Sequence, residues 1–211
     1  MAWSIKTKTD ILIGLFVGAL IAANLMGTKI AHVWIDFSVG IFAYPLTFLI
    51  TDVIEEVHGR KKAQNLVWAG LISLLFVLGI TFLALKLPSA SRDFFPAEYS
   101  KIFGISLRII LASTIAFLLS QSHDVWAFNL WKEKTKGKFL WLRNNASTIV
   151  SQFIDTVIFM FIAFYGVTPK HNVHYMFVLI IPYWLLKVLF AIFDTPFIYL
   201  GVWWLKKGSK E

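Results

Sequence analysis

NNASTIVSQFIDTVIF, residues Asn144–Phe159, combines a polar helical face with an otherwise apolar surface. At 100° per residue, an arc of roughly 100–120° gathers Asn144, Thr148, Ser151, Gln152 and Asp155. These side chains are amides, hydroxyls and one carboxylate, whereas a helix that faces water would carry Lys and Glu there. We therefore expect this face to bind a specific polar partner, which is either a neighbouring helix or a substrate.

Composition indicates a membrane protein. Of the 211 residues, 58% are hydrophobic and 15% are charged, whereas a soluble domain carries about 25% charged residues. The chain has no Cys, which excludes disulfides, thiolate chemistry and Cys-based metal sites. No cofactor or bound metal is expected. The formal net charge is +8. The basic residues that produce it lie in short segments between apolar stretches, so the charge indicates membrane topology and not nucleic-acid binding.

Six apolar segments approach the ~20 residues that one membrane crossing needs. They are expected at about 11–30, 39–56, 66–87, 105–130, 146–167 and 176–205, within a single transmembrane domain over 1–211. The second segment is short and contains Pro45, so we expect it to be kinked or partly re-entrant. The predicted fold class is an all-α integral membrane protein, a bundle of six transmembrane helices.

The distribution of basic residues predicts the orientation of this bundle. Thirteen of the 20 Lys and Arg residues lie before the first span, after the second, between the fourth and fifth, and after the sixth. By the positive-inside rule, both termini are expected in the cytoplasm.

Four carboxylates are expected deep in the bilayer. At a rise of ~1.5 Å per residue, Asp155 and Asp194 lie roughly 18 Å, and Asp52 and Asp124 roughly 12 Å, from the basic edge. A carboxylate that faced lipid would cost at least ~2.5–3.5 kcal/mol, so these groups must face inward. Lys187, two turns from Asp194 on one face, is the expected partner of Asp194. The acids outnumber the intramembrane bases, so some need protons, water or a ligand that donates hydrogen bonds.

The pattern Ser-Gln-x-x-Asp occurs twice, as Ser120-Gln121…Asp124 and Ser151-Gln152…Asp155. Gln and Asp at i and i+3 place an amide beside a carboxylate on one helix face. Two such faces opposed to each other would form a planar clamp around a ligand. The alternative is that these groups bond to each other and only hold the helices together.

The second span ends with Asp52 and Glu55 at i and i+3. The helix dipole disfavours acids at the C-terminal end of a helix, so we expect both residues to have a functional role. Glu56 either shares that task or pairs with Arg60 at i+4. Amides elsewhere in the spans are further candidates as ligand groups or packing contacts. The candidate substrate-binding residues are Asn24, Asp52, Glu55, Gln121, Asp124, Asn145, Gln152, Asp155, Lys187 and Asp194.

The run Glu55–Arg60 reads Glu-Glu-x-x-x-Arg, which resembles a signature of CAAX-type intramembrane proteases. Those enzymes also need Phe-x-x-x-His and a later His-x-x-x-Asn or Asp, and no His in this chain follows a Phe at that spacing. Signatures of serine, aspartyl and zinc intramembrane proteases are missing as well. An enzyme is therefore not expected.

Three stretches together resemble the queuosine precursor transporter family, within the vitamin uptake transporter group. They are Ala23–Lys29 (ANLMGTK), Tyr44–Asp52 (YPLTFLITD) with Glu55 and Gly59-Arg60-Lys61, and Trp141–Asn145 (WLRNN) with Ser151-Gln152 and Asp155. One departure is His58, at a position where the family usually has Tyr. The resemblance implies multi-pass insertion in the inner (plasma) membrane and uptake of a 7-deazaguanine, such as 7-cyano- or 7-aminomethyl-7-deazaguanine.

The resemblance also implies partners. The family is similar in outline to the substrate-binding S components of energy-coupling-factor transporters, which work with a separate ATPase module. The implied partners are therefore the deazapurine substrate, the lipid bilayer, a second copy of the chain in a homo-oligomer, and an energising ATPase module. The alternatives to a solitary carrier are such a subunit and a carrier for another vitamin-like heterocycle.

The residue chemistry suits a deazaguanine. Its Watson–Crick edge presents two adjacent N–H donors, which a carboxylate accepts, and a carbonyl that accepts from an amide. Asp beside Gln supplies that complement, and Phe or Trp can stack on the flat ring. Any polar planar heterocycle would fit as well.

Overall fold

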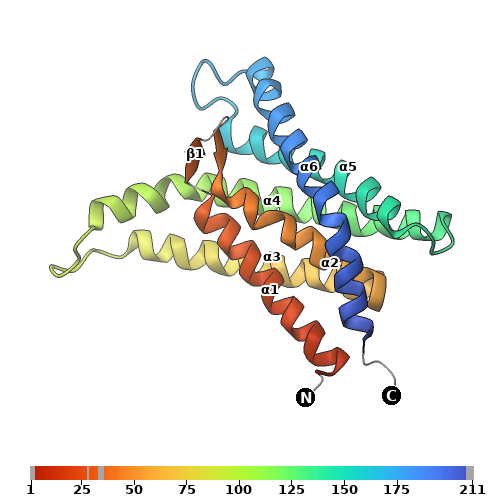
Figure 1. Ribbon diagram of the computed structural model, residues 1–211. Coiled ribbons are helices and arrows are strands. Elements are labelled where there is room, and N and C mark those ends of the chain that lie inside the picture. Colours follow the sequence, from red (N-terminus) through yellow and green to blue (C-terminus); the bar gives the residue numbers. More distant parts are fainter. Residues whose placement is uncertain (1–2, 28, 33–35, 208–211) are drawn as a thin grey trace.

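The structure is a computed structural model and describes residues 3–27, 29–32 and 36–207. Over these residues the chain forms six α-helices, a two-stranded hairpin and one 3-10 helix (Figure 1). In chain order they are α1 (Ile5–Met26), β1 (Ile30–His32), β2 (Asp36–Ser38), η1 (Val39–Phe42), α2 (Tyr44–His58), α3 (Arg60–Lys86), α4 (Pro96–Lys134), α5 (Leu140–Phe164) and α6 (Val173–Lys206).

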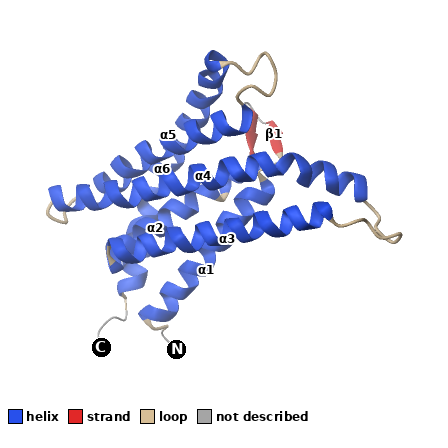
Figure 2. Ribbon diagram, turned by 180° about the vertical axis from the view of Figure 1, so that it is seen from behind, coloured by secondary structure: helices blue, strands red, loops and turns tan. Residues whose placement is uncertain are grey.

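The expected all-helical membrane architecture is confirmed, and among the described residues strands occur only in the small hairpin (Figure 2). Within the described residues, five helices are long and apolar enough to span a membrane, namely α1, α3, α4, α5 and α6. The helix α2 was expected as a sixth span but has only 15 residues. At ~1.5 Å per residue it reaches about 22 Å, short of the ~30 Å hydrocarbon core.

The second expected span differs from the structure at its start. It begins with the 3-10 helix η1, and α2 then starts at Tyr44 with Pro45 in its first turn. Proline fits this position because the first backbone N–H groups of a helix have no intrahelical acceptor. The expected span is therefore interrupted at Ala43, just before Pro45, and α2 then runs unbroken from Tyr44 to His58.

The first expected span is too long at its C-terminal end. The helix α1 ends at Met26, and Ile30 already belongs to the hairpin, while Thr28 lies outside the described residues. The hairpin pairs β1 with β2 antiparallel. The turn that follows it packs closely on α1, since a Cβ on Gly40 would lie 2.5 Å from the carbonyl oxygen of Ala23. Glycine is therefore required there.

Both ends of the described chain lie at the same end of the bundle. Lys8 Nζ donates to the backbone oxygens of Trp204 at 2.7 Å and Lys207 at 2.5 Å. Its ammonium group thereby caps the C-terminus of α6, where the helix dipole favours a cation. Figure 1 shows the start of α1 and the end of α6 side by side at the bottom, while the hairpin and the α5–α6 connection lie at the top. We call these the terminal end and the hairpin end.

The short helix α2 is the centre of the packing, in contact with α1, α3, α4 and α6. One apolar cluster joins α2 to α1, α3 and α4; it comprises Phe16, Leu20, Ile50, Ile54, Ala63, Leu66, Val67, Leu74, Phe117 and Val125. A Cβ on Gly70 of α3 would lie 2.8 Å from atoms of both Phe16 and Phe117. The absence of a side chain at Gly70 therefore lets these rings pack directly on α3.

Candidate functional site

A cavity of about 250 Å³ lies toward the hairpin end, between α1, α2, α4, α5 and α6. Its walls are largely apolar, and they include Ile41, Ile109, Phe159, Met160 and Phe164. Polar groups enter it from α1, α2, α5 and α6. We call this cavity the pocket.

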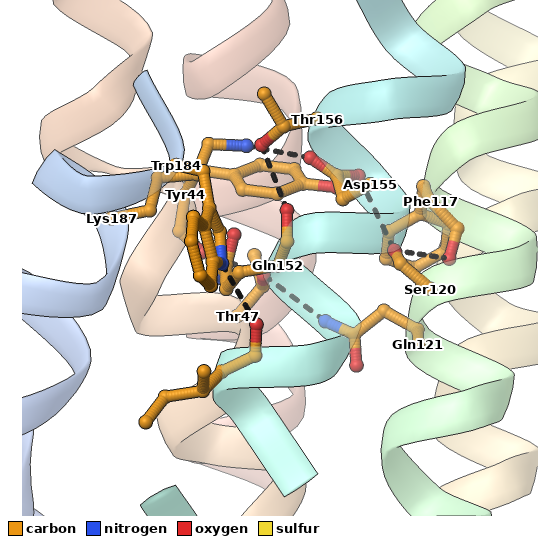
Figure 3. A network of polar contacts seen from close by, with 11 residues as sticks. Tyr44, Thr47, Phe117, Ser120, Gln121, Gln152, Asp155, Thr156, Trp184 and Lys187 are labelled. Carbon is orange, nitrogen blue, oxygen red and sulfur yellow. Dashed lines mark hydrogen bonds and ion pairs between the residues drawn. The ribbon is translucent and has the colours of Figure 1, made fainter. Parts of the chain in front are cut away.

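Asp155 of α5 is the centre of the pocket's polar groups (Figure 3). Its Oδ2 lies 2.6 Å from Nζ of Lys187 on α6, an ion pair with side-chain exposures of 5% and 12%. Its Oδ1 accepts from the hydroxyl of Tyr44 at 2.7 Å and from that of Ser120 at 3.2 Å. The carboxylate thus joins α2, α4, α5 and α6 at one point. We call Tyr44, Ser120, Asp155 and Lys187 the Asp155 network.

The partner of Lys187 differs from the expected one. Asp194 lies seven residues further along α6, which separates the two positions by about 10 Å along the axis. The Lys187 side chain instead reaches across to Asp155, and its Nζ lies 5.0 Å from the centre of the Tyr44 ring. The prediction that Lys187 pairs with Asp194 is therefore wrong. Asp194 is half-buried on α6 and does not line the pocket.

The Asp155 network can recognise a planar polar ligand. Each carboxylate oxygen accepts about two hydrogen bonds. In the structure Oδ1 receives two and Oδ2 receives one, so Oδ2 can accept one more. The Lys187 ammonium has three N–H donors, of which Asp155 uses one. Asp155 and Lys187 balance each other's charge, so this pair offers one free acceptor site on Oδ2 and spare donors without a net charge.

The two Ser-Gln-x-x-Asp faces do oppose each other, but crosswise. Ser120 of the first motif bonds to Asp155 of the second, and Ser151 of the second lies beside Asp124 of the first. His123 Nδ1 and Ser151 Oγ, 2.9 Å apart, add a further contact between α4 and α5. The polar faces therefore hold the helices together and, through Asp155, also reach the pocket.

The amides of these motifs lie below the pocket, toward the terminal end. Gln121 Nε2 donates to the hydroxyl of Thr47 on α2 at 3.2 Å. The side-chain amide oxygens of Gln121 and Gln152 are buried and have no hydrogen-bond partner among the described residues. Neither amide lines the pocket, so the structure does not bring both Gln–Asp pairs onto one shared ligand.

A second polar group lies deeper in the bundle. Asp52 and Glu55 of α2 and Asp124 of α4 are buried, with exposures of 0%, 1% and 0%. Thr148 of α5 donates to Asp52 Oδ2 at 3.4 Å. Hydroxyl groups of α5 also lie near Asp124, but within the described part of the chain neither of its carboxylate oxygens has a partner in hydrogen-bond geometry. The expected meeting of intramembrane acids thus holds for Asp52 and Asp124, while Asp155 lies in the pocket.

Glu56 belongs to neither group. Its carboxylate pairs with Lys132 at 3.0 Å and with Arg143 at 3.1 Å, and not with Arg60 as one alternative held. The Arg143 guanidinium is buried against the ring of Phe128, 5.4 Å from its centre. Of the two adjacent glutamates, Glu56 makes these ion pairs.

The two candidate asparagines have different surroundings. Asn24 lines the pocket, and its Nδ2 donates to Leu20 O of its own helix at 3.0 Å. Asn145 lies nearer the terminal end, where its Nδ2 donates to Thr195 Oγ1 of α6 at 2.8 Å. Asn145 therefore links α5 to α6 outside the pocket. Of the ten candidates, the pocket is lined by Asn24, Asp155 and Lys187.

Sequence reasoning missed Tyr44 and Ser120 as partners of Asp155. Ser120 was noted only as part of a repeated motif. Tyr44 carried one usable signal, since it is a polar aromatic residue directly before the proline of a short span. The hydroxyl of a buried tyrosine usually finds a hydrogen-bond partner.

Comparisons with known proteins identify relatives of this chain. Residues 38–201 match the family described as "Putative vitamin uptake transporter". The chain is 33% identical over 191 residues to the "Probable queuosine precursor transporter" of Bacillus subtilis (strain 168), covering 88% of this chain and 82% of that protein. It is 27% identical over 158 residues to the "Queuosine precursor transporter" of Escherichia coli (strain K12), covering 74% and 69%.

No solved structure gives a significant match to the chain. The family match spans η1, all of α2 to α5 and most of α6, and so includes Tyr44, Asp155 and Lys187 of the pocket. The resemblance noted from the sequence motifs is confirmed: this protein belongs to the vitamin uptake transporter family.

Proposed function

We propose that this protein imports a queuosine precursor, a 7-deazaguanine, across the inner membrane and binds it in the pocket. The names of both relatives support the substrate class. The observation that carries the proposal is the Asp155 network at one end of an otherwise apolar cavity of about 250 Å³. Small-molecule sites typically have this character, with apolar walls and a few placed polar groups.

The polar edge of a deazaguanine complements the network. One N–H of the base donates to Asp155 Oδ2, and its carbonyl accepts from a spare N–H of Lys187. The ring lies against apolar and aromatic walls such as Phe159 and Met160. Because Asp155 and Lys187 already balance in charge, a neutral base such as 7-cyano-7-deazaguanine meets no uncompensated charge.

The orientation supports uptake. Basic residues concentrate at the terminal end, so both termini and the α2–α3 and α4–α5 connections face the cytoplasm. The pocket, which Gly27, Ser38 and Gly40 line beside the hairpin, then lies in the outer half of the bilayer. A base arriving from outside reaches it first, and alternating access delivers the base to the terminal end.

The test is uptake of radiolabelled 7-cyano-7-deazaguanine into liposomes that contain only this purified protein. We expect saturable uptake that unlabelled 7-deazaguanines inhibit and other vitamin-like heterocycles do not. Inhibition by an unrelated heterocycle would assign a different substrate. Uptake that begins only when an ATPase module is added would contradict the solitary carrier and favour a subunit like the S components of energy-coupling-factor transporters.

A further inference from the structure

Asp52, Glu55 and Asp124 lie outside the pocket and have no task in the binding just described. They come from two helices, α2 and α4, and each is at most 1% exposed. Asp52 and Asp124 are close enough for their carboxyl groups to interact directly. We call these three residues the acid cluster.

Bases do not neutralise the centre of the acid cluster. Lys132 and Arg143 pair with Glu56, and Lys187 pairs with Asp155. Arg60 of α3 and Lys132 act on Glu55 from the terminal end. The charged groups that act on Asp52 are the acids Asp124 and Glu55.

The remaining ionisable groups on the helices around the cluster are engaged or lie apart. His58 of α2 contacts Thr9 of α1 through Nε2 at 2.8 Å. His123 of α4 contacts Ser151 of α5 at 2.9 Å. On α6, Asp194 is a further acid and is half-buried. Among the described residues, Asp52 and Asp124 thus face hydroxyls and each other.

Among the residues that the structure describes, several buried oxygens on α2 and α4 have no hydrogen-bond partner. They include Oδ1 of Asp52, both carboxylate oxygens of Asp124, and Oε1 of Gln121, which is fully buried. Figure 3 shows this Gln121 oxygen pointing away from Asp155, and Asp124 follows three residues later on the same helix. An amide oxygen can accept a hydrogen bond but cannot donate one. The buried Gln121 oxygen therefore needs a partner that donates a hydrogen bond or carries a positive charge.

The free-energy cost of burying two carboxylates side by side favours a positively charged partner for them. Two adjacent carboxylates cannot both stay ionised in a low-dielectric interior, because each loses its hydration and repels the other. Within the described part of the chain, no three His, Asp or Glu side chains are grouped so that they could hold a metal ion. A proton binds to a single carboxylate oxygen and needs no such group of three side chains. The protonated oxygen then donates a hydrogen bond to the neighbouring carboxylate.

We propose that Asp52 and Asp124 form a proton-binding site that couples import of the base to proton entry. This inference rests on the proposed function. The proton enters from the outer side, binds one carboxylate oxygen of the pair, and leaves to the cytoplasm when the carrier opens inward. Substrate and proton thus occupy separate sites.

The structure supplies a link between the two sites. The helix α2 carries Tyr44 in the pocket and Asp52 in the acid cluster, eight residues or about 12 Å apart. Gln121 of α4 bonds to Thr47 of α2 between them, and Thr47 Oγ1 in turn donates to Tyr44 O at 2.7 Å. A change in charge at Asp52 and Asp124 therefore acts on the two helices that also carry Tyr44 and Ser120.

The experiment measures accumulation of radiolabelled 7-cyano-7-deazaguanine in liposomes with an acidic exterior and the membrane potential clamped at zero. One proton per neutral base gives about tenfold accumulation per pH unit, since each unit is worth about 1.4 kcal/mol. We expect this for the wild type and for the control Glu133→Gln, an exposed acid on α4. Asp124→Asn is expected to lose accumulation but keep counterflow, the exchange of external labelled for internal unlabelled base.

Gradient-driven accumulation by Asp124→Asn, or wild-type accumulation that follows a sodium gradient instead of a pH gradient, would overturn the inference. If Asp124→Asn does not fold, Asp52→Asn carries the same expectation. A pH indicator outside wild-type vesicles should also report alkalinisation when the base is added. Absence of both binding and counterflow in the wild type would overturn the proposed function itself, whereas counterflow without proton coupling overturns this inference alone.

Discussion

Removal of the charge on Asp155 gives the sharpest prediction about the pocket. In Asp155→Asn the Lys187 ammonium keeps its buried position but loses the counter-charge 2.6 Å away. The amide oxygen of the new Asn still accepts from Tyr44 and Ser120, so the change is chiefly one of charge. Removing one partner of a buried ion pair costs about 3–5 kcal/mol, and we expect the free energy of unfolding to fall by about that amount.

A double variant separates charge from shape. Asp155→Asn combined with Lys187→Gln replaces the ion pair by two amides of similar size, which is often close to neutral for stability. We therefore expect the double variant to be more stable than either single variant. Asp10→Asn, an exposed acid on α1, is the matched control and should change the free energy of unfolding by less than about 0.5 kcal/mol.

The assay is reversible unfolding in mixed micelles, with the wild type, both single variants and the double variant measured together. The coupling energy from this cycle isolates the pairwise interaction. If the losses of the two single variants simply add in the double variant, Asp155 and Lys187 do not interact, and the described pocket is refuted.

Three further variants test the parts around the pocket. Tyr44→Phe deletes the hydroxyl that donates to Asp155, so unfolding free energy should fall by about 1.5–3 kcal/mol; an unchanged value in the micelle assay would contradict that bond. Gly70→Ala places a Cβ 2.8 Å from atoms of two aromatic rings, so the free energy of unfolding should fall by about 1–3 kcal/mol. The matched control is Gly79→Ala on the same helix, where a Cβ meets no atom within 4 Å and no such loss is expected. Glu56→Gln leaves the buried Arg143 guanidinium without its carboxylate, so stability should fall while the dissociation constant for the base, measured by calorimetry, stays unchanged.

Hydropathy predicted the long helices because each of them carries apolar residues on all sides. Such long apolar stretches can be recognised from the sequence without knowledge of the tertiary structure. Hydropathy could not predict how α2 begins, since Pro45 is compatible with a kink and with a first helical turn. The hairpin was missed for a different reason. Its strands have three residues each, too few for a period-2 pattern to stand out.

The expected depth of the acids in the bilayer predicted that they face inward, but it did not predict which partner each acid contacts. That depends on the rotation of each helix about its axis, which a sequence alone leaves open. Lys187 lies on the same helix as Asp194, yet α6 is turned so that its ammonium meets Asp155. The repeated Ser-Gln-x-x-Asp motif did predict that α4 and α5 face each other, because polar groups in a membrane protein need polar partners.

Direct binding tests the central claim, that the pocket with Asp155 holds a 7-deazaguanine. Calorimetric titration of the purified wild type with 7-cyano-7-deazaguanine should give saturable binding at one site. Asp155→Asn should weaken it by about 10- to 100-fold, the equivalent of one hydrogen bond to a charged group at about 1.5–3 kcal/mol. No binding to the wild type, or equal affinity in Asp155→Asn, would contradict the account.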